Sequence, residues 1–206
     1  MTCIYLIRHA ESIANSLGIL QGQTYDTPLS PLGIRQQKAL RNRMVNTKFD
    51  KILVSPLLRA NQTAIGLTGP VDLCPDILET NHGDWEGKSK NEIQQVWPDL
   101  YQEWLFRPSN VQFPNGEKFK DTYTRAVNWF NSIVNSGQTI AVVTHSNIIM
   151  CLLAHLEGKT ANDIWKYAMQ PTAVSLIEAA SPARIIYKND ITHLKNLTSD
   201  LSTQAL

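Results

Sequence analysis

The residues most capable of chemistry come after short apolar runs of the sequence. The runs are CIYLI (3–7), KILVS (51–55) and TIAVVT (139–144). The cationic and titratable residues that follow them, at once or within one helical turn, are Arg8, His9, Arg59 and His145. Two arginines and two histidines in one cleft would repel one another unless an anion lay between them, and guanidinium groups match phosphate oxygens in pairs. This combination predicts a phosphate site.

A histidine at such a site can also react. A neutral ring nitrogen can attack phosphorus, and an acid must then protonate the leaving alkoxide. Glu79 is the candidate acid, because it follows the apolar run VDLC (71–74) within ILETNHGDWEG. Burial or a neighbouring phosphate would raise its pKa toward neutrality. The sequence shows neither a phosphate-binding glycine loop nor an acidic cluster suited to Mg²⁺, which favours a side-chain nucleophile.

The elements that must position these residues alternate between strands and helices. Helices are predicted from Ser30-Pro31 to about residue 46, from Pro56 to residues 66–69, over 118–136, and from Ser146 to before Gly158. This alternation predicts βαβ units in a mainly parallel sheet, whose strand ends share one ligand-binding edge. The runs 172–179 and 183–189 predict a hairpin across Ser181-Pro182. The expected fold is an α/β three-layer α/β/α sandwich with a mainly parallel sheet, one antiparallel edge strand and a lid insertion.

Residues 76–116 fit this alternation poorly. They contain three tryptophans and several prolines, and such insertions often cover a site. We therefore expect residues 1–206 to form a single domain with a lid insertion at 84–120. Its tryptophans, Trp85, Trp97 and Trp104, would either line the mouth of the site or pack a small core of the lid.

The composition of the chain indicates which partners and which compartment to expect. The chain of 206 residues is 43% apolar and 18% charged, with a net charge of +1 and no cluster of Lys and Arg, which argues against nucleic-acid or acidic-membrane partners. Cys3, Cys74 and Cys151 lack metal-ligand spacing, and we expect Cys3 and Cys151 to be buried free thiols, as in a reducing compartment. No apolar run reaches the length of a membrane span. The expected location is cytoplasmic.

The motifs together resemble the histidine phosphatase superfamily, also called the phosphoglycerate mutase-like family, from Tyr5 to about Leu194. LIRHAES (6–12) resembles the family's Arg-His-Gly motif, with Ala10 in place of the usual glycine. The other similar segments are QGQTYDTPLSPLGIRQQ (21–37), SPLLRANQTA (55–64), LETNHGDWEG (78–87), PNGEKF (114–119) and ITHL (191–194). The resemblance implies that His9 is the phosphorylated nucleophile, and that Glu79 is the general acid and then the general base.

The resemblance also implies the binding residues. Arg8, Arg59 and His145 would bind the phosphoryl group with help from Asn15, and no metal or organic cofactor would be needed. The further substrate-binding candidates are Gln21, Gly22, His82, Ser146 and Asn147. His82 is alternatively a polar loop histidine, and His155 and His193 are expected to be structural. Ser146 replaces a usual glycine, so its side chain would either narrow the pocket or cap the following helix.

The expected function is a phosphomonoesterase that takes a small-molecule phosphate ester and releases inorganic phosphate. One alternative is a phosphoglycerate mutase primed by a bisphosphoglycerate; family mutases carry a longer insertion with paired arginines, whereas residues 84–116 contain Arg107 alone. The other alternative is a non-catalytic relative, which the presence of all five catalytic residues disfavours. Phosphorylated acids, sugar phosphates and ribazole phosphate all stay open as substrates, and so does the oligomeric state.

Overall fold

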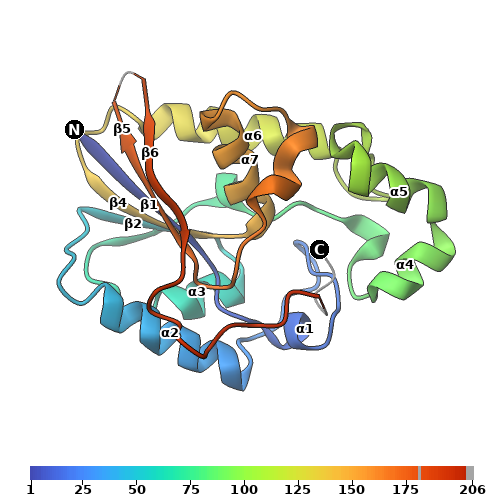
Figure 1. The fold of residues 1–206 in the computed structure, drawn as a ribbon, viewed down its shortest axis with the longest axis horizontal. Coiled ribbons are helices and arrows are strands. Elements are labelled where there is room, and N and C mark those ends of the chain that lie inside the picture. Colours follow the sequence, from blue (N-terminus) through green and yellow to red (C-terminus); the bar gives the residue numbers. More distant parts are fainter. Residues whose placement is uncertain (181, 203–206) are drawn as a thin grey trace.

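One six-stranded sheet organises the computed structural model, which describes residues 1–180 and 182–202. The strand order across the sheet is β3-β2-β4-β1-β5-β6 (Figure 1). The strands are β1 (Thr2–Arg8), β2 (Lys51–Val54), β3 (Val71–Leu73), β4 (Thr139–Thr144), β5 (Val174–Ala179) and β6 (Arg184–Asp190).

Four of these strands are parallel. β1 pairs with β4, β4 with β2, and β2 with β3, all in the parallel sense. β5 pairs antiparallel with β1 and with the edge strand β6. The predicted mainly parallel sheet with an antiparallel addition at one edge is therefore confirmed. The predicted hairpin turn includes Ser181, which lies outside the described residues.

Helices cover both faces of the sheet, as the predicted three-layer fold requires. They are α1 (Ile13–Ser16), α2 (Pro31–Arg43), α3 (Leu58–Ala64), α4 (Lys90–Val96), α5 (Pro98–Phe106), α6 (Phe119–Ile133) and α7 (Ser146–Leu156), with short 3₁₀ helices at Pro75–Ile77, Gly83–Trp85, Pro108–Asn110 and Ala161–Tyr167. In Figure 1, α6 and α7 lie above the sheet, and α2 and α3 lie below it. Each pair packs its own apolar cluster against one sheet face.

Local chemistry explains where two helices begin. α2 begins as predicted, because the Ser30 hydroxyl accepts a hydrogen bond from Gly33 N (2.9 Å) and Pro31 occupies the first helical position. The helix predicted from Pro56 begins later, at Leu58. The reason is that Asn61 Nδ2 donates to the carbonyls of both Ser55 (3.0 Å) and Leu57 (2.9 Å), which fixes an extended turn before the helix.

Residues 84–120 fold into α4, α5 and short 3₁₀ turns, and they lie to one side of the sheet in Figure 1. Their aromatic side chains pack on one another, with Trp104 at the centre: its ring centroid lies 5.2 Å from Phe113, 4.8 Å from Phe119 and 5.0 Å from Trp165. Trp85 and Trp104 are buried, whereas Trp97 is half-buried. These aromatic residues belong to the same apolar cluster as α6 and α7, so the small lid core expected for the tryptophans is continuous with the main core.

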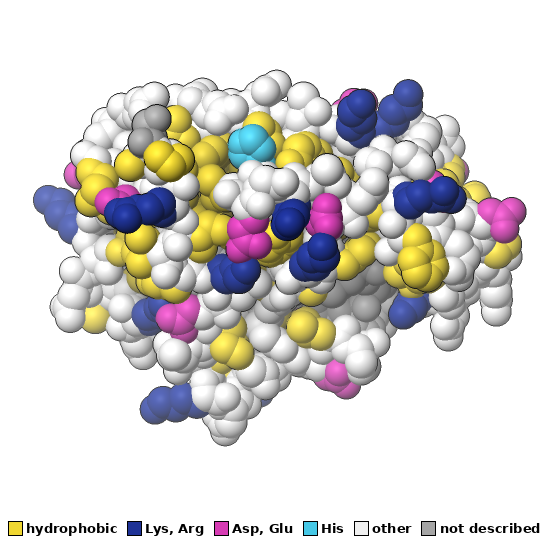
Figure 2. All heavy atoms as spheres, turned by 45° about the horizontal axis from the view of Figure 1, so that its top comes forward, with side chains coloured by type: hydrophobic (Ala, Val, Ile, Leu, Met, Phe, Trp, Pro, Cys, Tyr) yellow, Lys and Arg dark blue, Asp and Glu magenta, His cyan; other side chains and the backbone are white. Residues whose placement is uncertain are grey.

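The surface shown in Figure 2 carries charges of both signs, and the cysteine thiols are free. On the face shown in Figure 2, Lys and Arg side chains are interspersed with Asp and Glu. No helix within 1–180 and 182–202 has the length and apolar character needed to cross a bilayer. All three cysteines are free, and Cys151 is buried. The expectation of a buried Cys3 was wrong: it is half-buried, because the face of β1 that carries Cys3 and Tyr5 is only partly covered at its amino end.

Candidate active site

The site forms where β1, β2 and β4 end side by side. Val143 of β4 pairs with Ile7 on one side and with Val54 on the other, so the three strands end at the same level. The residues that follow are therefore brought together. The ring centroids of His9 and His145 lie 5.2 Å apart, and Arg59 Nε lies 3.3 Å from His9 Nε2.

A pocket opens above these strand ends. It is lined by Arg8, His9, Asn15, Leu20, Gln21, Arg59, Glu79, His82, Trp104, Ser146 and Asn147. Every site residue predicted from the sequence lines it except Gly22 and His145. His145 is fully buried beside His9, and Gly22 contributes its backbone carbonyl to Arg59, as described below.

His9 is held in the form that a nucleophile requires. Its Nδ1 lies 2.7 Å from the carbonyl of Ala10, which can only accept, so Nδ1 carries the proton and Nε2 carries the lone pair. Burial lowers the pKa of His9 well below its ordinary value of 6.5, and the nearby charges of Arg59 and Arg8 lower it further. At neutral pH the ring is therefore uncharged, with its nucleophilic nitrogen facing Arg59.

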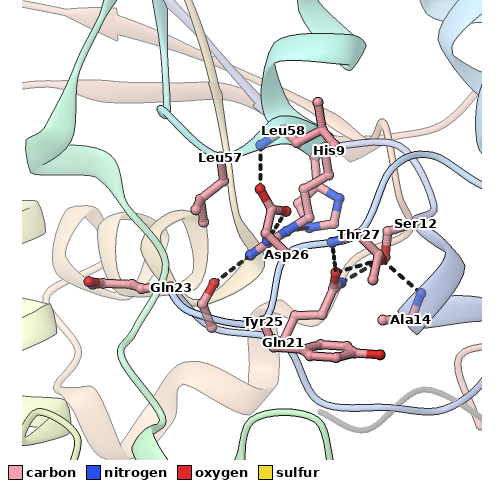
Figure 3. Close-up of polar contacts among 12 residues, drawn as sticks. His9, Ser12, Ala14, Gln21, Gln23, Tyr25, Asp26, Thr27, Leu57 and Leu58 are labelled. Atoms are coloured by element: carbon pink, nitrogen blue, oxygen red, sulfur yellow. Dashed lines mark hydrogen bonds and ion pairs between the residues drawn. The ribbon is translucent and has the colours of Figure 1, made fainter.

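The two arginines are buried cations with fixed geometry. Arg59 Nη1 forms an ion pair with Asp26 Oδ1 (2.7 Å), and its Nη2 donates to the Gly22 carbonyl (3.0 Å). Figure 3 shows Asp26 beside the start of α3, where it also accepts from the Leu58 backbone N–H. Arg8 Nη1 donates to the Met169 carbonyl. Burial lowers the pKa of Arg8 to about 10, which still leaves its charge intact at pH 7.

His145 lies behind His9 with one ring nitrogen engaged. Its Nε2 lies 2.7 Å from the Ser55 hydroxyl, and its buried Nδ1 has no hydrogen-bond partner. When the Ser55 hydroxyl donates to Nε2, Nδ1 carries the proton and can donate it to an oxygen of a bound anion. Burial, followed by the charge of Arg59, lowers the pKa of His145 well below 6.5.

Glu79 has the properties of a general acid. Its side chain is 5% exposed, and burial raises its pKa above the ordinary value of 4.5. The backbone N–H of Thr80, which donates to Oε1 (2.8 Å), and the charges of Arg59 and Arg8 act in the opposite direction without cancelling the effect of burial. A carboxyl group in this environment keeps a proton to higher pH than an exposed one.

Two of the predicted binding residues, Asn15 and Gln21, form hydrogen bonds within the protein. Asn15 Oδ1 accepts from the Ser12 backbone N–H (3.2 Å) and the Ser12 hydroxyl (2.9 Å) in a capping box. Gln21 Nε2 donates to the Ser12 hydroxyl (2.7 Å), and its Oε1 accepts from the Thr27 hydroxyl (3.0 Å). Ser146 does not cap α7: the cap position is His145, without a side-chain bond, and Ser146 lines the pocket instead.

His82 and His193, the two histidines in question, lie in different parts of the molecule and have defined contacts. His82 faces the pocket and packs edge-on against Phe113, with a centroid distance of 4.7 Å. His193 lies elsewhere, where its Nδ1 is 3.1 Å from Arg43 Nη1 and its Nε2 is 3.1 Å from the Thr172 hydroxyl, in keeping with the structural part expected for it.

Residues that the sequence did not single out support the site. Ser55 orients His145, Asp26 orients Arg59, and Leu20 and Trp104 add apolar walls to the pocket. Glu86 accepts hydrogen bonds from the backbone N–H groups of residues 23, 24, 25 and 82 and from the Thr24 hydroxyl. Of these residues, Ser55 alone could have been found from the sequence, because it ends an apolar run, just as Arg8 and His145 directly follow apolar runs. The other partners are joined by tertiary contacts.

Metal ligands do not gather in the described part of the chain. Among residues 1–180 and 182–202, no group of three or more His, Cys, Asp or Glu side chains has an arrangement that could hold a metal ion. The pocket's charged groups are two arginines and one carboxyl group, which suits a phosphoryl anion.

Comparison with known proteins identifies relatives along almost the whole chain. Phosphoserine phosphatase 1 of Hydrogenobacter thermophilus is 29% identical over 198 residues, which are 93% of this chain and 93% of that protein. The adenosylcobalamin/alpha-ribazole phosphatase of Salmonella typhimurium is 31% identical and aligns over 85% of this chain and 89% of its own. Relatives also include 2,3-bisphosphoglycerate-dependent phosphoglycerate mutase.

The fold agrees with these sequence relations. The structure of Bacillus stearothermophilus YhfR superposes with a TM-score of 0.86 at 28% identity, and the match covers 94% of this chain and 100% of that one. The family model for the histidine phosphatase superfamily (branch 1) matches residues 4–188. The chain therefore belongs to the histidine phosphatase superfamily, in keeping with a phosphoric monoester hydrolase.

Proposed function

We propose that the protein is a metal-independent phosphomonoesterase that hydrolyses a small phosphorylated metabolite through a phosphohistidine on His9. The observation that carries this proposal is the neutral His9, whose Nε2 lone pair faces Arg59 in a pocket that also holds the buried carboxyl group of Glu79. Arg8, Arg59 and His145 bind the phosphoryl oxygens.

The reaction proceeds in two steps. In the first, His9 Nε2 attacks phosphorus, the P–O bond to the leaving group breaks, and Glu79 gives its proton to the departing oxygen. In the second, the Glu79 carboxylate takes a proton from water while the water oxygen attacks phosphorus. The N–P bond then breaks, which releases inorganic phosphate and restores neutral His9 and protonated Glu79.

The position of Arg107, away from the pocket, supports hydrolysis over mutase activity as the reaction. Its side chain is 66% exposed and forms an ion pair with Glu103 Oε2 (2.7 Å), and it is not among the residues that line the pocket. Within the described chain, the lining thus offers no cations beyond Arg8 and Arg59 to hold the second acidic group of a bisphosphoglycerate.

We also propose that residues 84–120 act as a lid, since Trp104 lines the pocket from α5 while its ring packs against Phe113 and Phe119. Three free thiols are in keeping with work in a reducing cytoplasm.

The testing experiment measures phosphate release from an activated aryl phosphate by wild-type, His9→Ala and His155→Ala protein, with EDTA present. His155, in the last turn of α7, is the matched control because it lies away from the pocket. We expect turnover by the wild type and the control, and none by His9→Ala, because the covalent step needs the Nε2 lone pair. Wild-type rates in His9→Ala would exclude His9 as the nucleophile, and loss of activity in EDTA would exclude metal independence.

A second assay separates hydrolysis from isomerisation. The wild-type protein is incubated with 3-phosphoglycerate and a bisphosphoglycerate primer, and both free phosphate and 2-phosphoglycerate are measured. We expect free phosphate to exceed the isomer. Exchange between the two phosphoglycerates without phosphate release would identify a mutase.

A further inference from the structure

Asn147 lies beside the acid of the proposed reaction. It is the second residue of α7, and its backbone N–H lies close enough to the Glu79 carboxyl group to lower the pKa of that group against the effect of burial. Its side chain lines the pocket although the residue is only 5% exposed. Because Glu79 gives its proton to the leaving-group oxygen, Asn147 faces the leaving group rather than the attacking nitrogen.

The orientation of the Asn147 amide is set by its neighbours. The Gln21 carbonyl can only accept, and it lies 3.0 Å from His82 Nδ1, so Nδ1 of the neutral ring carries the proton. His82 Nε2 then has a lone pair and accepts from Asn147 Nδ2 at 3.2 Å. Asn147 Nδ2 also donates to the Thr80 hydroxyl at 3.1 Å. Both N–H bonds of the amide are thereby used, and Oδ1 is the polar atom left to meet a ligand.

The His82 ring cannot easily reverse this arrangement. It is 2% exposed and stands edge-on against Phe113 and Trp104, with centroid distances of 4.7 and 6.2 Å. Burial lowers the pKa of His82 to about 4, so the ring stays neutral at pH 7. Its Nε2 therefore continues to accept from the amide under physiological conditions.

We propose that Asn147 is a specificity-determining residue whose Oδ1 accepts a hydrogen bond from a hydroxyl or ammonium group next to the ester carbon of the leaving group. This inference rests on the proposed phosphatase function. The substrate class is then the phosphate esters of polyols or amino alcohols, and not plain alkyl phosphates. An ester without such a donor leaves Oδ1 buried and unpaired, which a site built for a hydrogen bond rejects.

The rest of the lining supports a neutral acceptor in this role. The charged residues that line the pocket are Arg8, Arg59 and Glu79, which serve the phosphoryl group and the proton transfer. Leu20 and Trp104 add apolar walls. The Ser146 hydroxyl also lines the pocket from α7, but it can donate as well as accept, whereas Asn147 Oδ1 can only accept.

The test compares kcat/KM for two esters of equal chain length, glycerol 3-phosphate and propyl phosphate, which differ in their hydroxyl donors. We expect wild type to prefer glycerol 3-phosphate by about tenfold or more, and Asn147→Leu to bring the ratio within about threefold. Asn131→Leu, the same change on the exposed face of α6, should keep the wild-type ratio.

Two further variants distinguish recognition from packing. Asn147→Asp keeps an acceptor but adds charge, and should raise kcat/KM for phosphoethanolamine relative to glycerol 3-phosphate by roughly tenfold. His82→Phe removes the group that orients the amide and should weaken the preference for glycerol 3-phosphate while Asn147 is intact.

The outcomes separate the inference from the function on which it rests. An aryl phosphate that is hydrolysed by wild type, together with equal use of glycerol 3-phosphate and propyl phosphate, would overturn the role of Asn147 and leave the phosphatase standing. A preference that survives in Asn147→Leu would do the same. Failure of wild type to hydrolyse any ester, aryl phosphate included, would instead reject the phosphatase function itself.

Discussion

At the scale of single residues, the site depends on burying ionisable groups and then fixing their protonation states. His9 and His145 are kept neutral by burial and by the neighbouring arginines, whereas burial keeps a proton on Glu79 to higher pH. The Ala10 carbonyl and the Ser55 hydroxyl decide which ring nitrogen of each histidine is free. His9 and His145 thus suit different proposed roles although they are the same residue type, because their partners leave different ring nitrogens free.

Glu79→Gln tests the acid. The amide cannot give a proton to a departing alkoxide, so kcat for esters with poor leaving groups, such as glycerol 3-phosphate, should fall by about a hundredfold or more, whereas activated aryl phosphates should lose far less. The measurement is kcat for both ester classes in wild type and variant. Equal losses on both classes would mean that Glu79 binds substrate or supports the fold instead.

Ser55→Ala tests the orientation of His145. Without the hydroxyl, His145 Nε2 loses its partner and Nδ1 is no longer held as the donor, so kcat should fall roughly tenfold. The fold should survive, and thermal unfolding followed by circular dichroism checks this. A variant with unchanged kcat would show that the Ser55 contact does not set the donor at Nδ1.

At the scale of elements, the segment 21–27 has no regular secondary structure, yet it determines the position of Arg59. It supplies Asp26 and the Gly22 carbonyl to that guanidinium group. Glu86 holds the segment through four of its five hydrogen bonds, and the fifth comes from the backbone N–H of His82. Burial raises the pKa of Glu86, but these bonds together lower it below its ordinary value, so the carboxylate is charged at neutral pH.

Glu86→Gln should therefore loosen the active site. An amide cannot accept from all five donors, so the free energy of unfolding should fall by roughly 2 to 3 kcal/mol, and KM should rise as Arg59 loses its support. The measurements are urea unfolding and steady-state kinetics on an aryl phosphate.

Glu92→Gln is the matched control for this change. Glu92 closes the capping box of α4 with Ser89, away from the pocket, so its replacement should lower the free energy of unfolding much less than Glu86→Gln does and leave KM unchanged. Similar kinetics in the two variants would contradict the role given to Glu86.

At the scale of the whole molecule, the buried histidines couple stability to pH. Burial lowers the pKa of His82 and of His193 to about 4, and that of His9 and His145 well below 6.5. Below pH 6.5 the unfolded chain binds protons that the folded chain does not, so the free energy of unfolding falls as the pH decreases. The raised pKa of Glu79 acts oppositely, since its contribution is lost as the pH rises.

His82 alone should contribute about 2 kcal/mol to the loss of stability between pH 7 and pH 5. The measurement is urea unfolding at both pH values for wild type and His82→Phe. The variant is expected to be less stable at pH 7, but its stability should fall less on acidification. The same fall in both proteins would show that His82 is not held neutral by burial.

The sheet, most of the helices and the residues that meet at the strand ends can all be predicted from the residue pattern. Apolar runs and helix-start residues such as Ser30 are local signals, and a parallel sheet necessarily brings its carboxyl ends to one edge. The start of α3 was misplaced at Pro56, because the Asn61 side chain makes bonds that a local pattern does not reveal.

The orientation of the site residues, in contrast, depends on contacts between segments that are far apart in the sequence. The Glu11 carboxylate accepts hydrogen bonds from the hydroxyl groups of Ser30 and of Ser199, which lies far from it in the sequence. The Gln21 carbonyl sets the tautomer of His82, and His82 in turn sets the amide of Asn147. These partners are far apart in sequence, and each hydrogen bond depends on a distance and an angle that exist only after the sheet, the loops and α7 have packed. Residue type and spacing therefore predict which groups are present, whereas packing decides which atom of each group faces the ligand.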